Sequence, residues 1–124
     1  MPGTDDAQRV LLAAERSRLA RQVADLTRDL QAIIDASADT NADDEHDPEG
    51  ATIGFERAQV ASLLEQARHR LAALDRAEDR LRAGTYGRCE RCGAPVPAER
   101  LTAHPTATTC VPCGQTAASI RAPR

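Results

Sequence analysis

Aliphatic side chains recur every seven residues on both sides of one polar stretch, and this pattern constrains the fold more than any other feature. Before the stretch the repeating positions are Leu12, Leu19, Leu26 and Ile33, with Val23 and Leu30 between them. After it they are Ile53, Val60, Ala67, Leu74 and Leu81, with Leu64 and Leu71 between them. Such a repeat marks the face that one helix packs against another. It predicts two helices, residues 4–36 and 48–83, each extending roughly 48 Å at the usual helical rise.

The polar stretch, residues 37–50, contains the Asn, Asp, Pro and Gly that favour turns. Two helices of matched length on either side of a short connection fold back as an antiparallel pair. The chain offers little to fill a larger core, since Met1, Phe55 and Tyr86 are its only methionine and aromatic side chains. We therefore expect an all-α fold in which residues 1–84 form an antiparallel coiled-coil hairpin with an acidic tip at residues 37–50.

Four cysteines follow the hairpin as two pairs, Cys89-x2-Cys92 and Cys110-x2-Cys113. This is the spacing with which four thiolates bind one zinc ion, each pair covering one side of a tetrahedron. Four protein ligands leave no open coordination position for a substrate water, so the ion would be structural. We predict a C4 zinc-finger module at residues 85–116 that holds one Zn²⁺, followed by a short helix or tail at residues 117–124.

Other interpretations of the cysteines have less support. The first ten residues have neither the basic start nor the apolar segment of a secretion signal, so we expect a cytoplasmic protein, where disulfides are disfavoured. A thioredoxin-like redox pair needs a βαβ context that the pattern does not show. An iron–sulfur cluster also uses four thiolates, but with other spacings. His104 is a conceivable ligand, although four cysteines already complete the set.

Acidic residues gather around the predicted tip. Between Asp29 and Glu56 the chain has nine acids and neither lysine nor arginine, although its net charge is only −3. One interpretation is a connection that its charge keeps in solvent. A second is a calcium loop, which is disfavoured because Asp44 and Gly50 stand where an EF-hand requires Gly and Glu. A third is a probe that carries carboxylates to a cation or to a basic surface of a partner.

Hairpin, acidic tip and cysteine spacing together resemble the DksA/TraR family of bacterial transcription factors with a C4-type zinc finger. The resemblance is carried by YGRCERCG at residues 86–93, by RLTAHPT at residues 100–106 and by CVPC at residues 110–113. These segments are similar to the family's YGxCxxCG…RLxAxPxAxxCxxC pattern. With the hairpin included, the resemblance covers nearly the whole chain.

The resemblance implies a direct interaction with bacterial RNA polymerase. In the family the coiled coil enters the secondary channel of the polymerase, where tip carboxylates approach the catalytic centre and alter promoter complexes. Counted back from the first cysteine, Glu49 and Ala51 occupy the family's acidic and alanine tip positions. The tip residues expected to contact the partner are Asp43, Asp44, Glu45, Asp47, Glu49 and Ala51.

One departure from the family concerns the alarmone (p)ppGpp. Members that respond to it tend to have Arg before the Pro of an RPT segment, where this chain has His104. The chain also contains no lysine, so the lysines that help elsewhere are missing. We therefore predict that (p)ppGpp has a weak effect or none.

Four arginines, Arg57, Arg88, Arg91 and Arg100, are candidates for docking on the rim of the channel.

The alternative function is a nucleic-acid-binding zinc ribbon, for which one Tyr is a poor stacking platform. We expect no sequence-specific DNA binding. No apolar run approaches the roughly 18 residues of a membrane span, so we expect no membrane contact. We also expect the protein to be a monomer. The sequence shows no nucleophile–base pair or phosphate loop, and we do not expect an enzyme.

Overall fold

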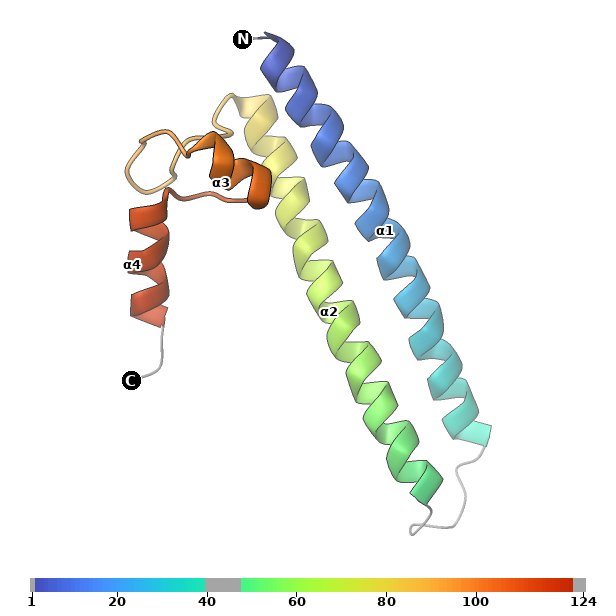
Figure 1. Ribbon diagram of the computed structural model, residues 1–124. Coiled ribbons are helices and arrows are strands. Elements are labelled where there is room, and N and C mark those ends of the chain that lie inside the picture. Colours follow the sequence, from blue (N-terminus) through green and yellow to red (C-terminus); the bar gives the residue numbers. More distant parts are fainter. Residues whose placement is uncertain (1, 40–47, 122–124) are drawn as a thin grey trace. The chain divides into compact units, whose positions relative to one another are not determined.

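The computed structural model describes residues 2–39 and 48–121. Its elements are α1 (Pro2–Asp39), α2 (Pro48–Ala83), α3 (Ala98–Ala103) and α4 (Val111–Arg121) (Figure 1). The described residues form no strand, although an isolated bridge pairs Arg88 with Pro95. The predicted all-α fold is confirmed. None of the four helices in this part of the chain is long and apolar enough to cross a membrane.

α1 extends further toward the polar stretch than the sequence predicted, because it continues to Asp39, whereas α2 begins at Pro48 and ends at Ala83 as predicted. Residues 37–39 and 48–50, at the two ends of the polar stretch, are therefore helical. A proline is tolerated at a helix start because the N–H that it lacks would have no partner there. Later in the chain, α4 continues through residue 121. It therefore crosses the predicted boundary between the zinc-finger module, residues 85–116, and the tail, residues 117–124.

The chain divides into two compact units. The first, which we call the metal unit, combines residues 1–14 with residues 73–124 and contains all four cysteines. The second, the helical unit, is formed by residues 15–72. Within each unit a segment of α1 lies antiparallel beside a segment of α2 (Figure 1). The predicted two-helix hairpin is therefore present.

Burial along the helices follows the seven-residue repeat. In the metal unit the buried helical side chains are Leu12, Leu74, Ala77 and Leu81, and in the helical unit they are Leu19, Leu64 and Ala67. Other repeat positions of the helical unit, namely Leu26, Leu30, Ile33, Ile53 and Val60, are half-buried. An ion pair also joins the two helices, since Glu15 of α1 lies 3.7 Å from Arg70 of α2.

Candidate metal centre

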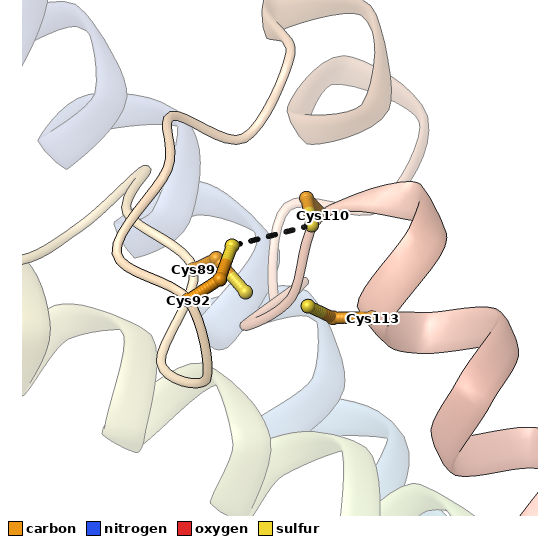
Figure 2. Close-up of side chains that lie close together, drawn as sticks. All are labelled: Cys89, Cys92, Cys110 and Cys113. Carbon is orange, nitrogen blue, oxygen red and sulfur yellow. Dashed lines mark hydrogen bonds between the residues drawn. The ribbon is translucent and has the colours of Figure 1, made fainter.

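The four cysteine side chains converge from two segments of the metal unit. Cys89 and Cys92 come from the loop after α2, whereas Cys110 directly precedes α4 and Cys113 lies in its first turn (Figure 2). All four sulfur atoms lie within 4.8 Å of one another, and the Sγ atoms of Cys92 and Cys110 are 3.7 Å apart. The sequence separates the pairs widely, and the fold brings them together.

Backbone hydrogen bonds shape the first pair into a tight turn. The N–H of Cys89 donates to the carbonyl of Ala94 at 2.8 Å, and the N–H of Gly93 donates back to the carbonyl of Cys89 at 2.9 Å. Just outside this turn, the N–H of Val96 donates to the carbonyl of Gly87 at 2.7 Å. These bonds fold residues 87–96 back on themselves, which holds the two thiols on the same side of the turn.

The second pair is held by the start of α4. The N–H of Gly114 donates to the carbonyl of Cys110 at 2.9 Å, which closes the first helical turn. Three of the cysteines belong to a small apolar cluster: Cys89, Val96 and Cys110 are buried, with Leu101 and Cys113 packed against them. This core is too small to order the segment alone, so metal binding would supply much of its folding free energy.

The thiols have unequal acidities. Hydrogen bonds from the backbone of Cys110 and Cys92, with a smaller one from Arg91, lower the pKa of Cys89 to about 6. Hydrogen bonds with the thiols of Cys110 and Cys89, together with burial, raise the pKa of Cys113 to about 12. In the metal-free site these surroundings therefore favour the thiolate at Cys89 and the protonated thiol at Cys113.

The donor set fits a zinc ion. A tetrahedral ion with Zn–S bonds of about 2.3 Å separates its sulfur ligands by about 3.8 Å, so the separation between Cys92 and Cys110 already has the required length. Four thiolates complete the coordination of the ion and leave no position for a reacting water. The arrangement suits an ion that stabilises the fold.

Two further residues support the site and were missed from the sequence. The guanidinium of Arg80 on α2 donates to the carbonyls of Thr85 and Arg88. The hydroxyl of Tyr86 donates to the carbonyl of Pro105 at 2.9 Å and lies 3.4 Å from Oε1 of Gln8 on α1. Both interactions depend on carbonyl groups of irregular segments, and no sequence pattern reports where such groups point.

The structure places the predicted partner-binding residues in different settings. Asp43, Asp44, Glu45 and Asp47 lie outside the described residues, and so does the side chain of Glu49. Ala51, Arg57, Arg88 and Arg91 are exposed. Arg100 is half-buried, and its Nε donates to the carbonyl of Thr109 at 2.9 Å, next to Cys110. Part of the Arg100 side chain thus stabilises the zinc-finger module at residues 85–116 itself, which we call the metal module.

Fold and site together define a class of protein, a two-helix hairpin with a four-thiolate zinc finger. Residues 84–117 match the family model of the prokaryotic dksA/traR C4-type zinc finger. The cysteine module of this chain is therefore similar to that family's zinc finger, which agrees with the resemblance found in the sequence. The predicted zinc finger is confirmed, and its four cysteines are positioned to bind one metal ion.

A solved structure resembles nearly the whole chain. The transcription factor DksA2 from Pseudomonas aeruginosa matches 94% of this chain and 84% of its own, with a TM-score of 0.78 and 26% sequence identity. The likeness therefore includes the hairpin as well as the zinc finger.

Curated relatives match shorter stretches. The uncharacterized protein YteA of Bacillus subtilis (strain 168) is 37% identical over 75 residues, which are 60% of this chain and 31% of that protein. General stress protein 16O of the same organism is 35% identical over 68 residues, 55% of this chain and 42% of that protein. An uncharacterized protein of Aquifex aeolicus (strain VF5) is 42% identical over 45 residues, 36% of this chain and 31% of that protein. The chain thus matches less than half the length of these relatives.

Proposed function

We propose that this protein is a cytoplasmic transcription regulator that binds RNA polymerase directly and acts as a monomer. The observation that carries the proposal is the combination of a dksA/traR zinc finger with a hairpin like that of the transcription factor DksA2. In this proposal the polar stretch at residues 37–50 enters the secondary channel and modulates promoter complexes. Its acidic character supports the proposal, because opposite charge steers association and fixes orientation at a basic opening.

The same features argue against catalysis by the chain. Four protein thiolates would leave a zinc ion without an open position, so it could not activate a water. In our proposal the chain alters the reaction of its partner and performs none itself.

The first experiment tests the partner. Immobilised protein is incubated with purified core RNA polymerase, with and without a zinc chelator, and the retained polymerase is measured. We expect retention by the zinc-loaded chain and loss of retention after chelation. Failure of the zinc-loaded chain to retain polymerase would refute direct binding.

The second experiment tests the tip. A variant with Asp43, Asp44, Asp47 and Glu49 changed to Asn or Ala should still fold and bind polymerase but lose its effect on transcription from a responsive promoter. The reason is that, in this proposal, the tip carboxylates act at the catalytic centre of the partner, while the helices and the metal module that hold the chain on the polymerase remain intact. Normal regulation by this variant would show that the stretch is only a solvated connection.

A charge-matched control separates the tip from net charge. Asp6, Asp25, Glu65 and Asp79 are exposed acids on α1 and α2, so changing all four alters the net charge by the same amount. Asp6, Asp25 and Asp79 each form an ion pair with the arginine three residues later. Exposed ion pairs contribute little to stability, about 0–1 kcal/mol each. The control variant should regulate as the wild type does.

The structure favours this function over a nucleic-acid-binding ribbon. Single-stranded nucleic acid is typically bound by exposed aromatic side chains on which bases stack. Tyr86 is half-buried, and its hydroxyl is occupied by the carbonyl of Pro105. A gel shift that weakens steeply with salt would instead support the ribbon.

A further inference from the structure

Arg80 connects the last turns of α2 to the loop that carries Cys89 and Cys92. Its Nη2 donates to the carbonyl of Thr85 at 3.1 Å and also to the carbonyl of Arg88. Its Nη1 lies 3.7 Å from Oε2 of Glu90, the residue after Cys89. The Arg80 side chain is 19% exposed, whereas that of Arg82, two residues further on, is 65% exposed. Arg80 is therefore turned into the metal unit and away from solvent.

The connection continues from Glu90 to the second cysteine pair. Oε1 of Glu90 accepts a hydrogen bond from the hydroxyl of Thr108 at 3.1 Å, and the backbone N–H of Glu90 donates to the carbonyl of Thr108 at 2.9 Å. Thr108 lies two residues before Cys110. Through these contacts one guanidinium on α2 reaches the segments that carry both halves of the metal site.

The backbone of Arg80 takes part in the same junction. Its carbonyl accepts hydrogen bonds from the N–H groups of Thr85 at 2.9 Å and Tyr86 at 3.2 Å. Both the main chain and the side chain of Arg80 therefore bond the end of α2 to the start of the loop that carries Cys89 and Cys92. An ordered loop stabilises the last turn of α2, and an ordered last turn stabilises the loop.

We propose that Arg80 is a positioning residue that couples zinc occupancy to the order of the last turn of α2. With zinc bound, the turn at Cys89–Cys92 is fixed. The carbonyl of Arg88 and the carboxylate of Glu90 are then held where the guanidinium of Arg80 can bind them. Without zinc the module loses most of its folding free energy, so these acceptors are no longer held in place. Because binding linkage is reciprocal, the same contacts raise the affinity of the site for zinc.

Hydrogen exchange on the full chain tests the coupling. The reporters are the amides of Gly84, Thr85 and Tyr86, which donate to carbonyls of Leu81 and Arg80. In the wild type, zinc should slow their exchange by about tenfold, as expected when charge-assisted hydrogen bonds close a local opening. In Arg80→Met, which keeps the aliphatic stem, zinc should slow their exchange by less than about threefold if this bond network carries the effect.

Two further variants make the test specific. Arg80→Lys keeps the charge but lacks the planar fork that reaches two acceptors, so it should resemble Arg80→Met. Arg82→Met removes an exposed guanidinium from the same helical turn and should behave as the wild type. Undiminished protection of Gly84, Thr85 and Tyr86 by zinc in Arg80→Met would overturn the proposal, and so would an equal loss in Arg82→Met.

Zinc affinity supplies the reciprocal measurement. Titration against a competing chelator should show weaker zinc binding by Arg80→Met, by the same factor as its loss of zinc-dependent protection. Unchanged affinity together with lost protection would contradict the coupling. Neither measurement uses polymerase. A negative result would therefore contradict the role of Arg80 without contradicting the proposed function, and the reverse also holds.

Discussion

Cys89 and Cys113 face the same cluster, yet their surroundings move the acidities of their thiols in opposite directions. Backbone hydrogen bonds from Cys110 and Cys92 favour the thiolate of Cys89, while its neighbours' thiols favour the protonated form of Cys113. Zinc binds thiolates, so the proton on Cys113 must leave when the ion enters. At the residue scale, zinc and protons compete for the same cysteine sulfur atoms.

The affinity of the site for zinc should therefore rise with pH. The pKa of Cys113 is raised to about 12, so its thiolate is rare throughout the physiological range and becomes more abundant as pH increases. We expect the apparent association constant to increase by about tenfold or more per pH unit between roughly pH 6 and 8, because at least one proton is released. Chelator competition at several pH values measures this slope.

The thiol of Cys89 makes the zinc affinity depend on pH in the same direction as the thiol of Cys113. The pKa of Cys89, lowered to about 6, makes its thiolate available above that pH and removes it as pH falls further. The slope should therefore steepen below about pH 6, where the ion must displace a further proton, the one on Cys89. A pH-independent affinity would mean that the ion enters without displacing protons.

At the scale of an element, the buried faces of the two long helices were easier to predict from the sequence than their ends. Leu12, Leu19, Leu64 and Leu74 were predicted from the repeat and are buried. The repeat did not include Ala77, which is also buried because it lies three residues after Leu74 on the same helical face. Helix ends were harder to predict, since Pro48 is compatible with a loop and with a first helical turn.

The end of α2 depends on one glycine. Gly84 has φ +78, and the N–H groups of Thr85 and Gly84 donate to the carbonyls of Arg80 and Leu81, which is a Schellman arrangement. Gly84→Ala should lower the free energy of unfolding by about 1 kcal/mol, because a Cβ is unfavourable in the left-handed region. Urea denaturation measures the change.

Gly54 is the matched control for this substitution. It lies inside α2, and a Cβ there would meet no atom within 4 Å apart from its chain neighbours and the backbone of its own helical turns. Gly54→Ala should stabilise the protein by about 0.8 kcal/mol through helix propensity. Equal effects of the two substitutions would contradict the assigned role of Gly84.

The packed face of α2 can be tested with two leucines. Leu74 is 2% exposed and Leu63 is 43% exposed. Leu74→Ala should cost about 3 kcal/mol because it leaves a cavity, while Leu63→Ala should cost less than about 1 kcal/mol. Thermal unfolding of the zinc-loaded chain compares the two, and a similar cost for both would show that the seam is misassigned.

At the scale of the whole molecule, the metal module and the long helices draw on different sources of stability. α1 and α2 contain 38 and 36 residues, whereas α3 and α4 contain 6 and 11. The long helices bury a leucine seam, and the module depends on its metal. The repeat and the cysteine spacing predicted both parts. The junction through Arg80 and Tyr86 was not predictable, because it forms only when segments distant in sequence present their carbonyl groups.

Zinc removal should therefore affect the two parts unequally. After chelation we expect far-UV circular dichroism to retain most of its helical signal, since α1 and α2 pack without the ion. Capture of polymerase should be lost at the same time if the module anchors the partner. Collapse of the helical signal on chelation would show that the hairpin itself depends on zinc.

The half-buried part of the seam has an evolutionary consequence. Leu26, Ile33, Ile53 and Val60 remain partly in water, so replacing one of them forfeits less transfer free energy than replacing Leu12 or Leu74. Selection for a stable fold acts weakly on such positions. Homologous chains should accordingly diverge faster there, which leaves the helices near residues 37–50 free to adapt to a different partner surface while the rest of the seam is conserved.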